Sequence, residues 1–307
     1  MEAAADRSAR RHYGPEGRSE WLDIDWREHL RWVRVDGCAV NLVELGDGPP
    51  LVFIHGLGGS WRNWLENLPA FAGDHRVIAP DLPGFGDSEM PAAPISINAY
   101  ARWVDDLLGQ LDVERAVVVG NSMGGFVGAE MAIECPRRVD RLVLVAAAGI
   151  SIQAHRHDRA MAMLYRLETV LAAYTAWMAG RSERLARRRR LRRQLLGMVA
   201  AHPGLLPPAL TAEQIRGTGK PGFLPALDAL TSYPLRERLE RIACPTLIVW
   251  GDRDRLVPLR DADEFERLIP DARKVVYADT GHVPMLERPD RFNADVAAFA
   301  RGDALSG

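Results

Sequence analysis

The sequence predicts an α/β fold, in which a helical cap is inserted into a doubly wound, mostly parallel sheet. Short apolar runs of strand length alternate with helix-length segments along most of the chain, and this alternation is typical of parallel sheets covered by helices. The alternation stops near Ile150 and resumes near Ile242, with long helical patterns between. With 307 residues, 47% of them hydrophobic, the chain can form one sheet domain plus an insertion.

The predicted strands are apolar, often β-branched runs that suit strands covered on both faces. They span residues 51–54, 76–79, 116–119, 142–146, 246–250 and 274–277, and residues 31–45 fit the antiparallel strands that often open such a sheet. The predicted core helices span residues 62–71, 97–111, 123–134, 260–268 and 290–299, and the cap helices about 157–179 and 182–201. The chain therefore divides into an N-terminal extension (1–30), an α/β core (31–149 and 242–307) and a cap (150–241).

Charge and composition argue against a nucleic-acid-binding protein. The 39 Lys and Arg residues nearly balance the 41 Asp and Glu residues, which leaves a net charge of −2. That total hides eight arginines and one glutamate between Arg181 and Arg193, a local charge of +7. We expect this run to form a solvated helix face of the cap, with attraction of lipid headgroups or an anionic substrate as the alternative.

The remaining composition predicts a cytoplasmic protein with no integral membrane segment. Cys38, Cys135 and Cys244 are widely spaced, form no metal-ligand pattern and are expected to be reduced. The first residues contain no apolar signal segment, and no run approaches 18 consecutive apolar residues.

A candidate nucleophile lies between a predicted strand and a predicted helix. Gly120-Asn121-Ser122-Met123-Gly124 matches the G-x-S-x-G pattern of a nucleophile elbow. A sharp strand-to-helix turn strains the serine backbone and exposes its oxygen at the carboxyl end of the sheet, and the flanking glycines avoid collisions. The N–H of Met123 would lie at the helix N-terminus, where negative charge is stabilised.

Three further loops follow predicted strands. In the glycine-rich loop 55–59 we expect His55 to be structural and the N–H of Leu57 to pair with that of Met123 as an oxyanion hole. His282 follows the last strand and is the candidate general base. Two acids in the loop after the 246–250 strand, Asp252 and Asp254, could orient it. With either one, the chain order is Ser…Asp…His.

These motifs resemble those of the α/β-hydrolase superfamily, in its group of serine hydrolases with a helical cap. Residues 81–88 (DLPGFGDS) resemble the family's D-x-P-G-x-G-x-S loop, and residues 281–289 match its G-H-x-P-x-x-E-x-P loop. Residues 251–258 match its G-x-x-D-x-x-x-P acid loop with Asp254 at the acid position, which favours Asp254 over Asp252. The resemblance covers about residues 40–150 and 242–299 and implies an eight-stranded sheet.

A serine at the elbow points to acyl chemistry, and the apolar residues of the cap favour a carboxylic ester with small to medium hydrophobic groups as the substrate. His282 would take the proton of Ser122, Asp254 would orient His282, and water would hydrolyse the acyl-enzyme. No metal or organic cofactor is expected; the expected partner is a small-molecule substrate, and a homodimer is left open. Candidate substrate-binding residues, some of which could equally pack the cap or a neighbouring helix, are Trp61, Tyr165, Trp177 and Val283.

Two alternatives stay open. Asn121 before the serine resembles the elbow of carbon–carbon bond hydrolases that act on ring-cleavage diketone acids. Those enzymes usually carry Trp after the Gly-His pair, where this chain has Val283, and they use a cap arginine that cannot be placed among so many. A triad-bearing receptor for a small molecule is the other alternative.

Overall fold

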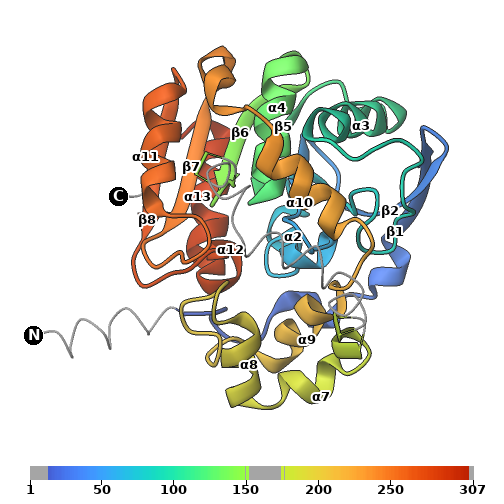
Figure 1. Cartoon of the computed structure of the whole chain (residues 1–307), viewed down its shortest axis with the longest axis vertical. Helices are drawn as coiled ribbons and strands as arrows, with labels where there is room; N and C mark the ends of the chain where they lie inside the picture. The colour runs from blue at the N-terminus through green and yellow to red at the C-terminus, as the bar shows by residue number, and fades with distance from the viewer. Residues whose placement is uncertain (1–12, 149, 152–173, 176, 304–307) are drawn as a thin grey trace, which may run out of the picture.

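The computed structural model describes residues 13–148, 150–151, 174–175 and 177–303 of the chain, and an eight-stranded sheet forms its centre (Figure 1). The sheet order is β1-β2-β4-β3-β5-β6-β7-β8. The pairs β1–β2 and β2–β4 are antiparallel and all other neighbours are parallel. The strands are β1 (Leu30–Val35), β2 (Cys38–Leu45), β3 (Pro50–Ile54), β4 (Arg76–Pro80), β5 (Ala116–Asn121), β6 (Val139–Val145), β7 (Thr246–Gly251) and β8 (Ala272–Tyr277). The predicted fold class is confirmed.

The central strands β3 and β5 are largely apolar because each buries both faces. In β3, Val52 and Ile54 belong to one hydrophobic cluster, whereas Leu51 and Phe53 belong to a second cluster across the sheet. Alternate side chains of a strand point to opposite faces, so a continuous apolar run supplies both clusters.

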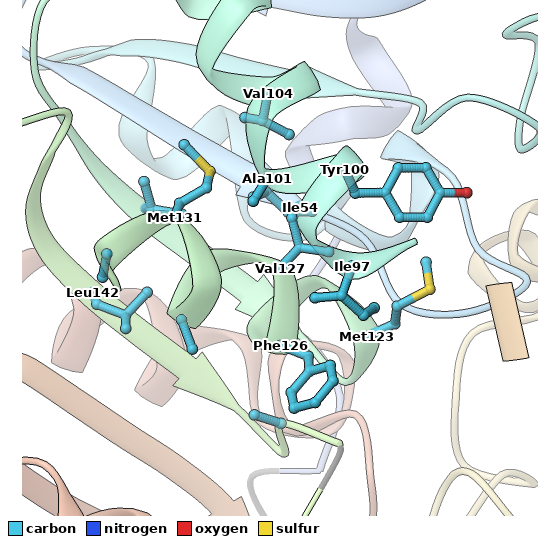
Figure 2. Close-up of a cluster of buried hydrophobic side chains, with 14 of the residues drawn as sticks. Ile54, Ile97, Tyr100, Ala101, Val104, Met123, Phe126, Val127, Met131 and Leu142 are labelled. Atoms are coloured by element: carbon cyan, nitrogen blue, oxygen red, sulfur yellow. The ribbon is translucent and has the colours of Figure 1, made fainter. Parts of the chain in front are cut away.

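Helices cover the two faces of this sheet. The first cluster includes residues of α3 (Ile97–Gln110), α4 (Met123–Glu134) and α11 (Leu259–Leu268). The second includes residues of α2 (Leu68–Phe71), α12 (Pro284–Glu287) and α13 (Pro289–Arg301). Figure 2 shows α3 and α4 side chains packing together with Ile54 and Leu142 of the strands. This packing fixes the start of α4, where Ser122 lies.

The helix predicted over residues 62–71 is wrong. The structure has a 3₁₀ turn, η4 (Trp61–Trp64), followed by the short α2. Pro69 has no N–H to donate, so an α-helical hydrogen bond back to Leu65 cannot form there. The chain instead turns at Asn67, whose N–H donates to the carbonyl of Trp64 at 2.8 Å.

Between β6 and β7 the structure describes α7 (Ser182–Ala186), α8 (Arg189–Leu196), α9 (Pro208–Arg216) and α10 (Phe223–Ser232). Figure 1 shows α7, α8 and α9 gathered at one end of the molecule, while α10 runs alongside the core. The 3₁₀ helix η6 (Arg236–Arg241) leads back to β7. Most of the helix predicted over 157–179 lies outside the described residues, and the cap boundaries stay a prediction.

The single helix predicted over residues 182–201 is also wrong. Arg188 is extended, with φ −95° and ψ 108°, and separates α7 from α8. The buried Arg192 stabilises this break, because its guanidinium donates to the carbonyl oxygen of Ala186 and, at 3.0 Å, to that of Gly204. The other arginines of the basic run are exposed. No helix within the described ranges is long and apolar enough to cross a membrane.

Candidate active site

Ser122 lies at the turn from β5 to α4 in a strained backbone conformation. Its φ of 53° and ψ of −116° fall where non-glycine residues are rare. The turn is held on both sides: the Ser122 N–H donates to the Val145 carbonyl at 2.9 Å, and the Ser122 carbonyl accepts from Ala148 at 3.1 Å. Such over-determination is what maintains a strained residue.

The glycines around Ser122 are required by close backbone contacts. A methyl group on Gly120 would clash with the backbone of Gly124, and one on Gly124 would clash with the carbonyl oxygen of Ile54. The strand and the helix therefore approach more closely than any side chain would permit. This explains the G-x-S-x-G spacing in steric terms.

His282 and Asp254 form a buried pair beside this turn. The Nδ1 of His282 lies 2.8 Å from Oδ2 of Asp254, and both side chains are almost fully buried. The other carboxylate oxygen of Asp254 accepts the N–H groups of Leu256 at 2.8 Å and Val257 at 2.9 Å. Asp254 is thus fixed by its own loop and holds the imidazole through Nδ1, which leaves Nε2 for proton transfer.

The second acid of that loop does not reach the histidine. Asp252 is exposed, and its Oδ1 accepts the N–H of Thr280 at 3.2 Å. The geometry therefore favours Asp254 as the acid that orients His282.

Asn121 links the serine turn to the histidine loop. Its side-chain amide donates to the carbonyl oxygens of Val145 at 3.1 Å and His282 at 3.2 Å. In the sequence, Asn121 is notable only because it resembles the elbow of carbon–carbon bond hydrolases. Its bond to His282 could not be predicted, because the two residues are 161 positions apart and share no local pattern.

The two proposed oxyanion donors lie on either side of Ser122. Met123 begins α4, and the Phe126 N–H donates to the Ser122 carbonyl at 3.2 Å, so the Met123 N–H belongs to the open first turn of the helix. Leu57 lines the same cavity as Ser122. Its loop lies against the turn, since a methyl group on Gly56 would be 3.2 Å from the Ser122 Cβ.

His55 is a structural residue of this loop. It is fully buried, its Nε2 accepts the Leu82 N–H at 3.0 Å, and its Nδ1 donates to the Gly56 carbonyl at 2.8 Å. Burial lowers the pKa of this imidazole below its usual value, so the ring is neutral.

Ser122 and His282 open into one cavity of about 430 Å³, which we call the serine cavity. Its wall combines the loops at the carboxyl ends of the strands with α10 and the segment 196–206. The apolar lining residues include Leu196, Val199, Leu206, Phe223, Leu227, Leu230 and Val283.

Of the candidate substrate-binding residues, only some lie at the serine cavity within the described part of the chain. Val283 lines the serine cavity. Trp61 does not: it is 3% exposed, its ring centroid lies 5.0 Å from that of Trp26, and its backbone N–H donates to the buried carboxylate of Asp81. Trp177 is 46% exposed, stacks with Tyr174 and Arg181, and is not among the residues that line the cavity. Tyr165 lies outside the described residues.

The substrate role expected for Trp61 is therefore corrected to an anchor, because Asp81 turns its backbone inward and its ring packs on the N-terminal extension. The role expected for Trp177 is not supported by its position.

Two amide side chains of the serine cavity were missed by sequence reasoning. Asn63 Nδ2 donates to Gln214 Oε1 at 2.7 Å, and Gln214 Nε2 donates to the Arg62 carbonyl at 2.8 Å. Both residues line the cavity. The position of Asn63 after a glycine-rich strand-end loop was an available signal, whereas nothing in the cap sequence distinguished Gln214.

Glu287 joins the histidine loop to the cap and to the N-terminal extension. Its carboxylate accepts the N–H groups of Gly281 at 2.9 Å and Ala201 at 2.8 Å, and the hydroxyl of Tyr13 at 2.6 Å. Burial raises the pKa of Glu287 to about 7. The His282 N–H adds a direct bond to the cap, donating to the Val199 carbonyl at 2.7 Å.

Within the described ranges, no group of three or more His, Cys, Asp or Glu side chains is arranged to hold a metal ion.

Comparison with known proteins places these features in a family context. Residues 49–289 match the family model described as "alpha/beta hydrolase fold". A 2-hydroxymuconate semialdehyde hydrolase of Pseudomonas sp. (strain CF600) is 33% identical over 88% of this chain and 93% of its own length. The dihydrolipoyllysine-residue acetyltransferase component of the acetoin cleaving system of Cupriavidus necator is 32% identical over 85% of this chain, which spans 66% of that protein.

One of the similar solved structures matches this chain over most of the length of both proteins. The meta-cleavage product hydrolase of Pseudomonas fluorescens IP01 has a TM-score of 0.69 and 26% identity, covering 89% of this chain and 97% of its own.

Proposed function

This chain belongs to the α/β-hydrolase family, and from that premise we propose that it is a serine hydrolase of uncharged carboxylic esters with small to medium hydrophobic groups. Ser122 would attack the carbonyl carbon, His282 would take its proton, and Asp254 would hold the imidazole. The N–H groups of Leu57 and Met123 would stabilise the oxyanion, each contributing about 3 kcal/mol in analogous sites. Water would then release the acyl group.

The observation that carries this proposal is the character of the serine cavity. Apart from His282, none of its described lining residues has an ionisable side chain, and its other polar side chains are the neutral Asn63, Asn121, Ser122, Gln214 and Thr218. A carboxylate substrate would be desolvated in such a cavity with no Lys or Arg among the described lining residues to compensate, which costs several kcal/mol. An uncharged ester loses little on entry and gains from the apolar walls.

A carbon–carbon bond hydrolase is the second candidate. Two of the proteins reported above are named a 2-hydroxymuconate semialdehyde hydrolase and a meta-cleavage product hydrolase. Asn121 matches the elbow of the carbon–carbon bond hydrolases. Val283 in place of the usual tryptophan and the uncharged lining weigh against a diketone acid.

One assay series separates the two candidates. We would compare kcat/KM of the wild type for p-nitrophenyl esters of increasing acyl length with that for a ring-cleavage diketone acid. The ester proposal requires multiple turnover of the esters, with kcat/KM rising from acetate to butyrate as the apolar wall is filled. Turnover of the diketone acid alone would favour the second candidate, and no turnover of either would favour a receptor.

A further inference from the structure

The segment 196–206 has a different cavity on each side. Leu196, Val199, Ala200 and Leu206 face the serine cavity. Gly197 and residues 201–205 line a second cavity of about 300 Å³, whose other walls are Arg189, Arg193 and Arg255. The two cavities share no lining residue. We call the second one the arginine pocket.

The arginine pocket gathers positive charge without a neutralising acid. No Asp or Glu lines it, and within the described part of the chain none of its three arginines forms an ion pair with a carboxylate. The guanidinium of Arg255 donates to the Gly197 carbonyl at 3.1 Å, which draws it to the rim of the pocket. The nearby His202 is already bonded to Asp279 at 2.8 Å, and Arg253 also pairs with that carboxylate.

Two of the arginines lie close to the same backbone position, Gly204. Arg189 and Arg193 lie one turn apart on α8, so they share a face and repel each other. A methyl group on Gly204 would lie 3.0 Å from Nε of Arg189 and 3.3 Å from Nε of Arg193. Gly204 itself is fixed by the buried guanidinium of Arg192. Arg189 is the first residue of α8, at the end of a helix that favours anions over cations, whereas Arg193 lies in the last turn.

We propose that the arginine pocket binds a phosphate-class oxyanion, either free phosphate or the phosphate of a lipid headgroup. Arginine forks match phosphate oxygens with paired, charge-assisted hydrogen bonds. Three guanidinium groups from two elements, α8 and the acid loop, enclose a space that accommodates such a group. The bound anion would offset the repulsion between Arg189 and Arg193. This site is separate from Ser122 and does not depend on the reaction that Ser122 performs.

The test measures binding of inorganic phosphate to the full chain by titration calorimetry in phosphate-free buffer at fixed ionic strength. We expect saturable binding in the wild type, weakened at least about tenfold in Arg189→Gln/Arg193→Gln because charge-assisted bonds are lost. The matched control Arg188→Gln/Arg190→Gln removes the same charge from exposed arginines outside the pocket and should bind like the wild type. Arg255→Gln provides a second, independent variant on the core side, with the expected loss in the same direction.

Sedimentation with vesicles separates the two sources of phosphate. Binding to phosphatidylglycerol vesicles but not to phosphatidylcholine vesicles, lost in Arg189→Gln/Arg193→Gln and kept in the control, assigns the lipid headgroup; phosphate binding without vesicle binding assigns a free phosphate. Equal losses in the pocket variant and the control would overturn the proposal, as would binding of neither probe. Unchanged unfolding temperatures verify that the variants are folded.

Discussion

The side-chain amide of Asn121 donates a hydrogen bond to the backbone carbonyl of His282 at 3.2 Å. The residue before the proposed nucleophile thus fixes the loop that carries the proposed base. A second bond from the same amide, to Val145, anchors Asn121 to the neighbouring strand. The geometry between Ser122 and His282 therefore depends on a side chain that need not touch substrate.

Replacing Asn121 should weaken catalysis through position. Asn121→Ala removes the donor to the buried His282 carbonyl, which costs about 1–3 kcal/mol of stability, and we expect kcat to fall by about tenfold with little change in KM. Asn121→Asp places carboxylate oxygens against two carbonyls and should be worse. Steady-state kinetics with pH profiles would measure this, and wild-type kcat in Asn121→Asp would refute the positioning role.

The two loop acids should differ sharply. Asp254→Asn leaves the shape but not the charge that orients His282, so kcat should fall by roughly 10⁴-fold, as in analogous triads. Asp252→Asn should retain activity within a few-fold, because the carboxylate of Asp252 is on an exposed residue and accepts the Thr280 N–H instead of orienting His282. Ester kinetics on both variants decides the assignment, and the reverse order would transfer the role to Asp252.

Glu287 should make stability depend on pH. Its pKa is raised from 4.5 to about 7 by burial, so between these values the unfolded chain has released a proton that the folded chain keeps. Stability contributed by this group is therefore greatest below about pH 4.5, falls as pH rises to about 7 by on the order of 3 kcal/mol, and is constant above.

Urea unfolding of the wild type and Glu287→Gln across this pH range isolates the effect. The difference in free energy of unfolding, wild type minus variant, should decrease with rising pH. A difference that increases with pH, or stays flat, would show that Glu287 is ionised throughout.

The tight contact at the serine turn predicts a strong position dependence for glycine substitutions. Gly124→Ala would drive a methyl group into the Ile54 carbonyl, so we expect loss of soluble protein or destabilisation beyond the 1–3 kcal/mol or so typical of overpacking. In Gly128→Ala, on the same helix, the methyl group meets only side-chain atoms of Leu142 at 3.1 Å and Val118 at 3.3 Å. Thermal unfolding should rank Gly128→Ala well above Gly124→Ala, and equal values would contradict the steric explanation.

Much of the core could be predicted because its signals are local. The apolar runs that became β3 to β8 and the strand-end loops of Ser122, Asp254 and His282 each have a recognisable pattern in a short window. Chain order and loop position were enough to expect that these three residues meet.

The helix over residues 62–71 failed for a local reason, Pro69, but other errors and omissions depend on contacts between residues that are separated in the sequence. Trp61 is turned inward because Asp81 accepts its backbone N–H. Arg192 is buried, and not part of a solvated face, because its guanidinium donates to the carbonyls of Ala186 and Gly204. Tyr13 bonds to Glu287 across 274 positions. The paired amides of Asn63 and Gln214 are likewise 151 positions apart. No periodicity or local motif encodes such pairings.

The proposed acyl-enzyme on Ser122 is tested most directly by intact mass spectrometry after rapid mixing with p-nitrophenyl butyrate and acid quenching. We expect a transient butyryl adduct that maps to the peptide containing Ser122. Ser122→Ala should show no adduct and lose at least about 10⁴-fold in kcat. Ester turnover that persists in Ser122→Ala at the wild-type rate, or an adduct on another residue, would contradict the serine mechanism.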